Sequence, residues 1–223
     1  MLADNLSRKS IIVVGAGRHA RVLVDALVLR DARIIGLIDP CKDKGSECWG
    51  FTILGDDNIL RGYNGVDVGL VNGLGSALTS PGNPSRRVVA SRLEAKGFHF
   101  LTVIHPSAII CSDCTFGVGS QVMAGAVIQA GVNIGDSCII NTGVIIDHGC
   151  EISAGCHLAP GVTLSGGVVV GENTHIGTGA VVIHDVKIGA NCIIGAGSII
   201  HQDVPDNAKF VQPRVSISTM IEL

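Results

Sequence analysis

From Ile104 to Ile200, an aliphatic residue or phenylalanine stands at every sixth position without a skipped step. Four positions after each of these residues, the chain carries Ala, Cys, Ser, Thr or Val. Helices repeat near 3.6 residues and ordinary strands near 2, so neither explains two rows that are locked at a period of six. A hexapeptide period is typical of a parallel β-helix, in which stacked repeats bury one continuous core. We therefore expect a parallel β-helix in the second half of the chain.

The six-residue period also predicts which positions share a wall of the β-helix. In each repeat two inward positions flank one outward position, which gives a short strand with alternating sides. Triplets that are often glycine-rich then turn the corners, and three repeats close a triangular coil of 18 residues. Residues 18 positions apart should therefore stack on the same wall.

Composition agrees with a narrow prism and excludes some classes of function. Aromatic residues make up 3% of the chain, and glycine accounts for 30 of its 223 residues. The formal charge is −3, so no bulk attraction to nucleic acid or to an anionic membrane is implied. The sequence shows no apolar stretch of membrane-spanning length and no signal-peptide pattern, and we expect a cytoplasmic protein.

The eight cysteines indicate packing more than redox or metal chemistry. Five of them fall in the small inward position of the repeat, where a free thiol behaves as a small hydrophobic group: Cys114, Cys138, Cys150, Cys156 and Cys192. Cys111 and Cys114 form a CxxC pair, a pattern that also occurs in zinc and redox sites. The repeat already accounts for Cys114 and no second CxxC follows, so we predict no metal site.

The first hundred residues predict a separate, small Rossmann-like α/β domain. Apolar strand patterns alternate there with helical patterns, which is typical of a parallel sheet. The expected strands are 11–14, 34–38 and 66–71, and the expected helices are 20–29 and 86–96. We predict a nucleotide-sugar-binding domain over residues 1–102, a β-helix domain over 103–205 and a C-terminal tail over 206–223.

A glycine turn follows the first of these strands. Gly15-x-Gly17-x-x-Ala20, with Asp39 further on, resembles a dinucleotide fingerprint. A hundred residues hold only one mononucleotide half, which argues against NAD. The exposed N–H groups of a helix N-terminus favour a phosphate, and residues 1–103 carry net charge +3 while 104–223 carry −6. A strand-to-helix turn without a ligand remains an alternative.

The combination of a glycine-turn domain with an unbroken hexapeptide β-helix resembles the NeuD/PglD family of sugar acetyltransferases. The resemblance spans nearly the whole chain, and its main stretches are VVGAGRHARVLVDAL, TVIHPSAII, INTGVIIDHGCEI and CHLAPGVTLSGGVVVG. It implies a left-handed β-helix and an acyltransferase that uses acetyl-CoA, without a metal, to acetylate an amino or hydroxyl group of an activated sugar. It also implies a homotrimer with active sites at the subunit interfaces.

Histidines outside the prism are the candidates for chemistry. His148 lies in a corner, His157 lies on an outward strand position with His175 one coil later, and His184 lies two coils after His148. A neutral imidazole on a rigid wall can act as a general base, whereas for His175 and His184 we favour a solvent-facing role. By resemblance, His148 is the catalytic base, and Asn141 positions the reacting group of the sugar.

The resemblance also assigns binding residues. For acetyl-CoA it implies His157, Gly166, whose N–H would face the developing oxyanion, and Thr178. For the nucleotide sugar it implies Gly17, Arg18, His19, Asp39, Pro40 and Gly73. The basic groups left in the β-helix half are Lys187, Lys209 and Arg214, which are candidates for the CoA phosphates or for a solvated surface role.

The chain departs from the family pattern at several positions. Gly149 stands where relatives usually carry an acid directly after the catalytic histidine, so Asp147, Asp136 or an acid of a neighbouring subunit would have to orient the imidazole. Pro40 replaces a residue that is often acidic. The ending VQPRVSIS also differs from the usual pattern, which affects the expected contacts with the CoA adenosine.

Several functions remain open at this stage. The first is an acetyl-CoA-dependent N-acetyltransferase on a nucleotide-linked amino sugar, such as a UDP- or GDP-4-amino-4,6-dideoxyhexose, in surface-glycan (O-antigen) biosynthesis. The second is an O-acetyltransferase on a sialic-acid-like sugar. A zinc carbonic anhydrase on the same β-helix would need three converging histidines, and His184 has no close partner in sequence. The fourth possible function, after the carbonic anhydrase, is that of a protein that binds a nucleotide sugar without catalysis.

Overall fold

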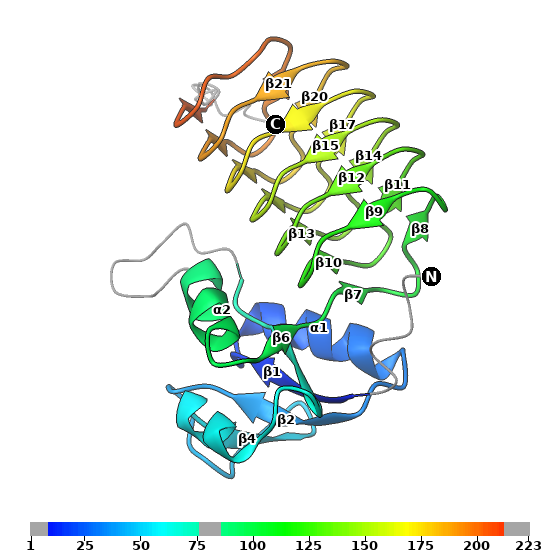
Figure 1. Ribbon diagram of the computed structural model, residues 1–223. Helices are drawn as coiled ribbons and strands as arrows, with labels where there is room; N and C mark the ends of the chain where they lie inside the picture. The colour runs from blue at the N-terminus through cyan, green and yellow to red at the C-terminus, as the bar shows by residue number, and fades with distance from the viewer. Residues whose placement is uncertain (1–8, 76–85, 212–223) are drawn as a thin grey trace, which may run out of the picture.

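The computed structural model describes residues 9–75 and 86–211 of the chain. An α/β unit at the N-terminus is followed by a long stack of triangular coils, and the first coils lie directly beside the α/β unit (Figure 1). This is the predicted combination of a parallel sheet and a hexapeptide β-helix. The exact division between residues 102 and 103 stays a prediction.

The α/β unit has one six-stranded sheet with strand order β3-β4-β2-β1-β5-β6. All pairings are parallel except that of β3 with β4. The strands are β1 (Ser10–Val14), β2 (Ile34–Ile38), β3 (Glu47–Cys48), β4 (Phe51–Gly55), β5 (Val68–Asn72) and β6 (His99–Phe100). The helices are α1 (Arg18–Val28), the 3-10 helix η1 (Asp57–Gly62) and α2 (Arg86–Glu94).

Two element starts differ by two residues from the sequence expectation, and the other expected boundaries agree to within two residues. Helix α1 begins two residues early, at Arg18, with Gly17 as its N-cap in extended conformation. Strand β5 begins at Val68 rather than at position 66. The reason is a local turn, because the side-chain oxygen of Asn64 accepts the N–H of Val66 at 2.9 Å and holds that residue out of the sheet.

The contact between the α/β unit and the β-helix is apolar. The buried face of α1, which includes Leu23 and Leu27, belongs to the same hydrophobic cluster as Val103, Met123 and Ile139 of the β-helix. These three residues are 0% exposed. Buried apolar contact of this kind orients the glycine turn at the start of α1 relative to the first β-helix coils.

The β-helix has three parallel walls, which we call C, D and E. Wall C contains β7 (Val103–Ile104), β10 (Gln121–Val122), β13 (Ile139–Ile140), β16 (His157–Leu158), β19 (His175–Ile176), β22 (Ile193–Ile194) and β24 (Lys209–Phe210). Wall D contains β8 (Ile109–Ile110), β11 (Val127–Ile128), β14 (Ile145–Ile146), β17 (Thr163–Leu164), β20 (Val181–Val182) and β23 (Ile199–Ile200). Wall E contains β9 (Thr115–Phe116), β12 (Asn133–Ile134), β15 (Glu151–Ile152), β18 (Val169–Val170) and β21 (Lys187–Ile188).

The 18-residue stacking is confirmed along most of the stack. His157 pairs with His175, and Asn133 pairs with Glu151. The last coil is shorter, because Ile193 pairs with Lys209 and Ile188 bridges to Val204, each 16 residues apart. Val204 therefore continues the wall E strands instead of filling the small position that the period assigned to it. Beyond this coil, residues 212–223 of the expected tail, including Arg214, lie outside the described residues.

The inward cysteines are core residues, as predicted, and they also donate hydrogen bonds. Cys138 Sγ donates to the carbonyl oxygen of Ser153, and Cys156 Sγ donates to that of Gly171, each at 3.1 Å. In both cases the acceptor lies 15 residues later in the chain. The hydroxyl of Thr174, one coil on in the same row, donates in the same way to Gly189. Alanine fits this position but makes no such bond, so thiols and hydroxyls add a hydrogen bond to the filling of space.

Replacing Cys156 by alanine is expected to lower the free energy of unfolding by about 1–3 kcal/mol, because it opens a small cavity and leaves a buried carbonyl without its donor. Cys156→Ser keeps the donor and should lose less. Chemical denaturation of both variants, with Cys41→Ala at an exposed thiol as control, measures the difference. Equal losses for alanine and serine would contradict a bonding role of the thiol.

The outward rows of the walls differ in chemistry. Wall E presents mainly polar residues, including Thr115, Asn133, Glu151 and Lys187. Wall D presents exposed apolar side chains along its length: Ile109 is 67% exposed, Ile145 43%, Val181 36% and Ile199 55%. Thr163 interrupts this row, but four exposed apolar side chains on one wall are typical of an interaction surface.

Candidate functional site

His148 lies at the edge between walls D and E, where its imidazole rests on the next coil. A Cβ on Gly166 would come 2.5 Å from Cε1 and 2.7 Å from Nε2 of the ring. The backbone of Gly166 is not in the left-handed region, so glycine is required there by the space the imidazole takes and not by backbone conformation. Within the part of the chain that the structure describes, the Gly166 N–H makes no hydrogen bond.

The missing acid after His148 has a structural explanation. Gly149 has φ +66°, and a Cβ there would meet nothing within 4 Å. The corner one coil on, at Gly167, also has positive φ, +72°. The corner therefore favours glycine, although Asp185 occupies the same position two coils after Gly149 with φ 60°. The space that a family carboxylate would fill is open.

Neither intrachain substitute for that acid bonds to the imidazole. The Asp147 carboxylate accepts the backbone N–H of His148 at 2.7 Å. Asp136 accepts the N–H of Val118 at 2.7 Å and follows β12 on wall E, so it lies at the edge between walls E and C. Within one described chain, the His148 ring is held by its fit against Gly166 rather than by a carboxylate.

Asn141 and His157 form a second polar pair, on wall C and its edge with wall D. The Asn141 side-chain oxygen accepts the N–H of Thr142 at 2.8 Å, which assigns its amide nitrogen as the donor to His157 Nε2 at 3.2 Å. His157 therefore carries its proton on Nδ1, and this buried nitrogen has no hydrogen-bond partner among the described residues. Burial, with a smaller contribution from the neighbouring His175, lowers the pKa of His157 to about 3, so the imidazole is neutral.

The predicted acetyl-transfer residues are thus not gathered in one place within a single chain. His148 and Gly166 lie at the D–E edge, whereas Asn141 and Thr178 lie at the C–D edge, with wall D between them. Lys187 lies on wall E and Lys209 on wall C, and both are exposed. His184 lies two coils after His148 at the D–E edge and is also exposed.

The residues assigned to the nucleotide sugar do meet in one place. A cavity of about 760 Å³ opens at the glycine turn, between the ends of β1, β2 and β5 and helix α2. Its lining includes all six of the predicted residues, Gly17, Arg18, His19, Asp39, Pro40 and Gly73. Sequence reasoning did not identify Val89 and Arg92 of α2, which also line it. The ionic contact of Arg92 with Asp57 closes that side.

Asp39 helps to build this cavity. Its two carboxylate oxygens accept the backbone N–H groups of Ala16 and Cys41, both at 2.8 Å. These bonds tie the glycine turn to the end of β2 and place the carboxylate beside the turn. Gly73 is required by close packing, since a Cβ there would lie 2.6 Å from that of Ala20.

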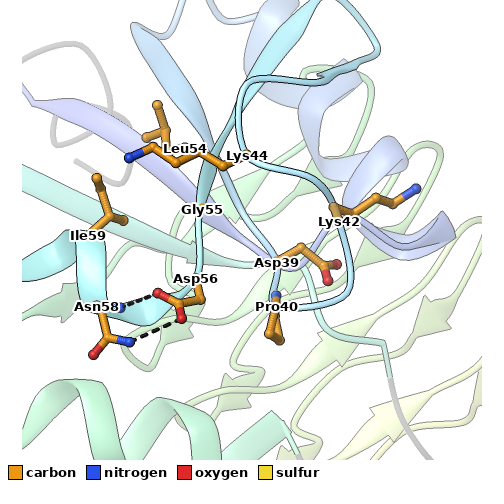
Figure 2. A pocket seen from close by; sticks show the side chains of 9 residues that line it. All are labelled: Asp39, Pro40, Lys42, Lys44, Leu54, Gly55, Asp56, Asn58 and Ile59. Atoms are coloured by element: carbon orange, nitrogen blue, oxygen red, sulfur yellow. Dashed lines mark hydrogen bonds between the residues drawn. The ribbon is translucent and has the colours of Figure 1, made fainter.

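A second cavity of about 500 Å³ lies on the other side of Asp39 and Pro40. Figure 2 shows its lining, in which Lys42 and Lys44 come from one loop and Asp56 and Asn58 from the start of η1. Asp56 accepts two hydrogen bonds from Asn58, at 2.9 Å and 3.0 Å. The two cavities share four lining residues, Asp39, Pro40, Asp56 and Asn58, so the glycine-turn cavity continues into this more polar one.

A chain of hydrogen bonds connects the glycine turn to the β-helix and to α2. Gln121 Nε2 donates to the carbonyl of Asn72 at 2.7 Å, which leaves Gln121 Oε1 to accept from His19 Nε2 at 2.8 Å. The Asn72 amide in turn donates to the carbonyl of Arg86 at 3.1 Å. Sequence reasoning missed Gln121, Asn72 and Arg86. The sequence carried no signal for them, because only the structure shows that Gln121, in an outward row of the β-helix, is buried and needs partners from another element.

Neither a metal site nor a membrane span is found among residues 9–75 and 86–211. No group of three or more His, Cys, Asp or Glu side chains there could hold a metal ion. The hypothesis of a zinc enzyme therefore gains no support from the described histidines. No described helix is long and apolar enough to cross a membrane.

Comparisons with known proteins agree with this arrangement. The family profile of the PglD N-terminal domain matches residues 10–80, and that of the bacterial transferase hexapeptide matches residues 167–202. The acetyltransferase domain of PglB from Neisseria gonorrhoeae FA1090, solved with acetyl coenzyme A, is 32% identical with TM-score 0.82, over 91% of this chain and 95% of that one. A search by sequence among curated proteins found no match.

Two further solved structures extend the comparison. A histidine mutant of perosamine N-acetyltransferase from Caulobacter crescentus, solved with CoA and GDP-perosamine, is 35% identical with TM-score 0.80, over 90% of this chain and 92% of that one. WeeI from Acinetobacter baumannii AYE is 15% identical with TM-score 0.61, which shows a shared fold. Identity above 30% over nine-tenths of the chain, with both family profiles in the expected halves, shows that the chain belongs to the PglD-type sugar acetyltransferases of the hexapeptide-repeat superfamily.

Proposed function

We propose that the protein transfers the acetyl group of acetyl-CoA to the amino group of a nucleotide-linked amino sugar. A UDP- or GDP-4-amino-4,6-dideoxyhexose is the expected substrate class, in the cytoplasm, as a step of surface-glycan biosynthesis. One observation carries the proposal: over 90% of its length the chain is 35% identical to an N-acetyltransferase solved with CoA and GDP-perosamine. The glycine-turn cavity gives a place for the nucleotide.

His148 is the proposed general base. The amine of the sugar attacks the thioester carbonyl, the new C–N bond forms, and His148 accepts the proton that the amine loses. The C–S bond then breaks, and the CoA sulfur leaves as the thiol after taking a proton back. The unbonded N–H of Gly166 is suited to stabilise the oxyanion of the tetrahedral intermediate, because it lies directly beside the imidazole.

A second copy of the chain completes the proposed site. His148 and the pair Asn141 and His157 lie at different edges of one prism, separated by the apolar row of wall D. Packing wall D against a neighbouring copy buries that row and lets one copy's His148 face the other copy's Asn141 and His157. A closed ring of three copies satisfies every chain in the same way, so we propose a homotrimer with active sites at its interfaces.

In that arrangement the unpaired Nδ1–H of His157 has an evident use. It is a buried donor on a neutral ring, and a carbonyl oxygen of the acetyl-CoA arm would provide the acceptor that is not found among the described residues. Thr178 is placed further along the same edge, where the pantetheine would lie, and Lys187 is proposed for the CoA phosphates.

The release of CoA thiol tests the proposed function. UDP-, GDP-, CMP- and dTDP-sugars are screened for binding with acetyl-CoA present, and thiol release is then followed for each bound sugar with an amino group and for its hydroxyl counterpart. We expect turnover with an amino sugar and at least about 100-fold less with the hydroxyl compound, because the amine is the better nucleophile. Faster release with the hydroxyl acceptor would assign O-acetylation instead, and no release with any acceptor would favour a binding protein.

A further inference from the structure

Arg86 carries a buried charge for which residues 9–75 and 86–211 provide no carboxylate as counter-charge. Its side chain is part of the buried face of α2 and the residue is 7% exposed. All three guanidinium nitrogens lack a hydrogen-bond partner among the described residues. Burial lowers the pKa of Arg86 to about 10, so the group is still a cation at neutral pH. An unpaired buried cation is strongly unfavourable for folding, so an anion is needed to complete this site.

The backbone of Arg86 is held firmly in place. Its carbonyl accepts the amide of Asn72, whose own carbonyl accepts the amide of Gln121, and Gln121 accepts from His19 of the glycine turn. Asn72 and Gln121 are 3% and 0% exposed. The backbone of Arg86 is therefore fixed at the junction of the glycine turn, α2 and wall C. The guanidinium is buried and does not move freely at a surface.

The groups around the guanidinium include two histidine rings and the thiol of Cys138, which donates its hydrogen to the carbonyl of Ser153. The charge of Arg86 contributes to the lowered pKa of both His19 and His157, so it lies near both rings. Within residues 9–75 and 86–211, one ion pair is found, between Arg92 and Asp57, and Arg86 has no carboxylate partner. Unmatched donors without an acid indicate that the missing component is an acceptor with negative charge.

The glycine-turn cavity reaches the same face of α2, although the Arg86 side chain does not itself line it. Val89 lines the cavity, and it lies three residues after Arg86 on the same buried face of α2. His19, which also lines the cavity, is connected by the hydrogen bonds described above to the backbone carbonyl of Arg86. A ligand with its base and ribose near Asp39 and Pro40 and its sugar directed toward wall C would carry its diphosphate past this junction. The planar guanidinium matches two phosphate oxygens at once.

We propose that Arg86 binds the diphosphate of the nucleotide-linked sugar, an inference that rests on the proposed function. It adds a specific residue to a site for which the glycine turn alone was expected to hold phosphate. It also explains why α2 begins with a buried arginine.

The test measures binding in the full-length protein without acetyl transfer. Isothermal titration calorimetry compares wild type, Arg86→Met and Arg86→Lys, with GDP, UDP, the corresponding nucleosides and CoA as probes. Arg87→Met is the matched control, since Arg87 is the same residue type one position on, exposed and bonded to Asn173. We expect Arg86→Met to weaken binding of the preferred nucleoside diphosphate about 10- to 100-fold and to leave the nucleoside and CoA within about twofold. Arg86→Lys should lie between, and Arg87→Met should match wild type.

A melting experiment without ligand separates binding from a structural role. Removing an unpaired buried charge should leave the melting temperature of Arg86→Met unchanged or raise it. Unchanged affinity for the nucleoside diphosphate in Arg86→Met, or a fall in melting temperature with affinity intact, overturns the proposal. Weaker CoA binding with intact nucleotide binding overturns it as well, because the diphosphate would then be that of CoA. Failure of wild type itself to bind any nucleoside diphosphate would instead refute the proposed function on which this inference rests.

Discussion

Replacing His148 by asparagine is expected to lower kcat about 10²- to 10⁴-fold, the usual contribution of a general base. Asparagine keeps much of the ring's volume and polarity but cannot accept the proton of the attacking amine. His148 is exposed at the D–E edge and makes no contact in the buried core, so the melting temperature should stay within a degree or two of wild type. Steady-state thiol release, with amino sugar and acetyl-CoA both saturating, measures kcat.

A matched control is available two coils further along the same edge. His184 occupies the equivalent corner and is exposed. The glycine that accommodates an imidazole, Gly166, lies beside His148 and not beside His184. His184→Asn is expected to retain kcat within about twofold. Near-normal turnover of His148→Asn, or equal losses for both variants, would contradict the assignment of His148 as the base.

The β-helix was predictable because its period is a property of every repeat. A wall position is defined by sequence separation alone, so the pairing of His157 with His175 and the contact of His148 with Gly166 follow from counting. Prediction ended where the repeat ends. Ile200 is the last member of the six-residue series. The shortened coil that aligns Val204 with Ile188 follows it, and sequence separation no longer predicts the pairing there.

The glycine-turn residues were also accessible, because Gly15, Gly17 and Asp39 carry a local motif that lies within one short stretch. The hydrogen-bond chain through Gln121 and Asn72 was not. Its members are up to 102 residues apart, and they meet only because α1 packs on the first β-helix coils. Arg86 was likewise not identifiable from sequence, since an arginine at the start of a helix is normally solvent-exposed and only tertiary packing buries this one.

The absence of an acid at position 149 changes how the imidazole is held. In the described chain no carboxylate bonds to the His148 ring, and the orientation comes from the flat contact with Gly166. Steric contact with Gly166 then orients the imidazole, a role that a hydrogen bond to a carboxylate has in a catalytic triad. The glycine under the ring is then needed for turnover because it leaves space for the imidazole in this position.

Gly166→Ala is therefore expected to lower kcat about 10- to 1,000-fold while the protein stays folded. The new Cβ would lie 2.5 Å from Cε1 and 3.0 Å from Nδ1 of His148, so the imidazole must rotate away from the attacking amine. The backbone of Gly166 is outside the left-handed region, which lets alanine adopt it without strain. Thiol release and thermal melts of the same preparations measure the two effects separately.

The double variant provides the decisive comparison. If Gly166 acts by positioning His148, Gly166→Ala should cost little or nothing in a protein that already carries His148→Asn, because the group it positions has lost its proton acceptor. Gly62→Ala is the control, at a glycine with ordinary φ and open space around it, and it should behave as wild type. Losses that multiply in the double variant would mean that Gly166 acts on the oxyanion independently of the base, and a large fall in melting temperature would mean that the coil itself cannot accept the extra methyl group.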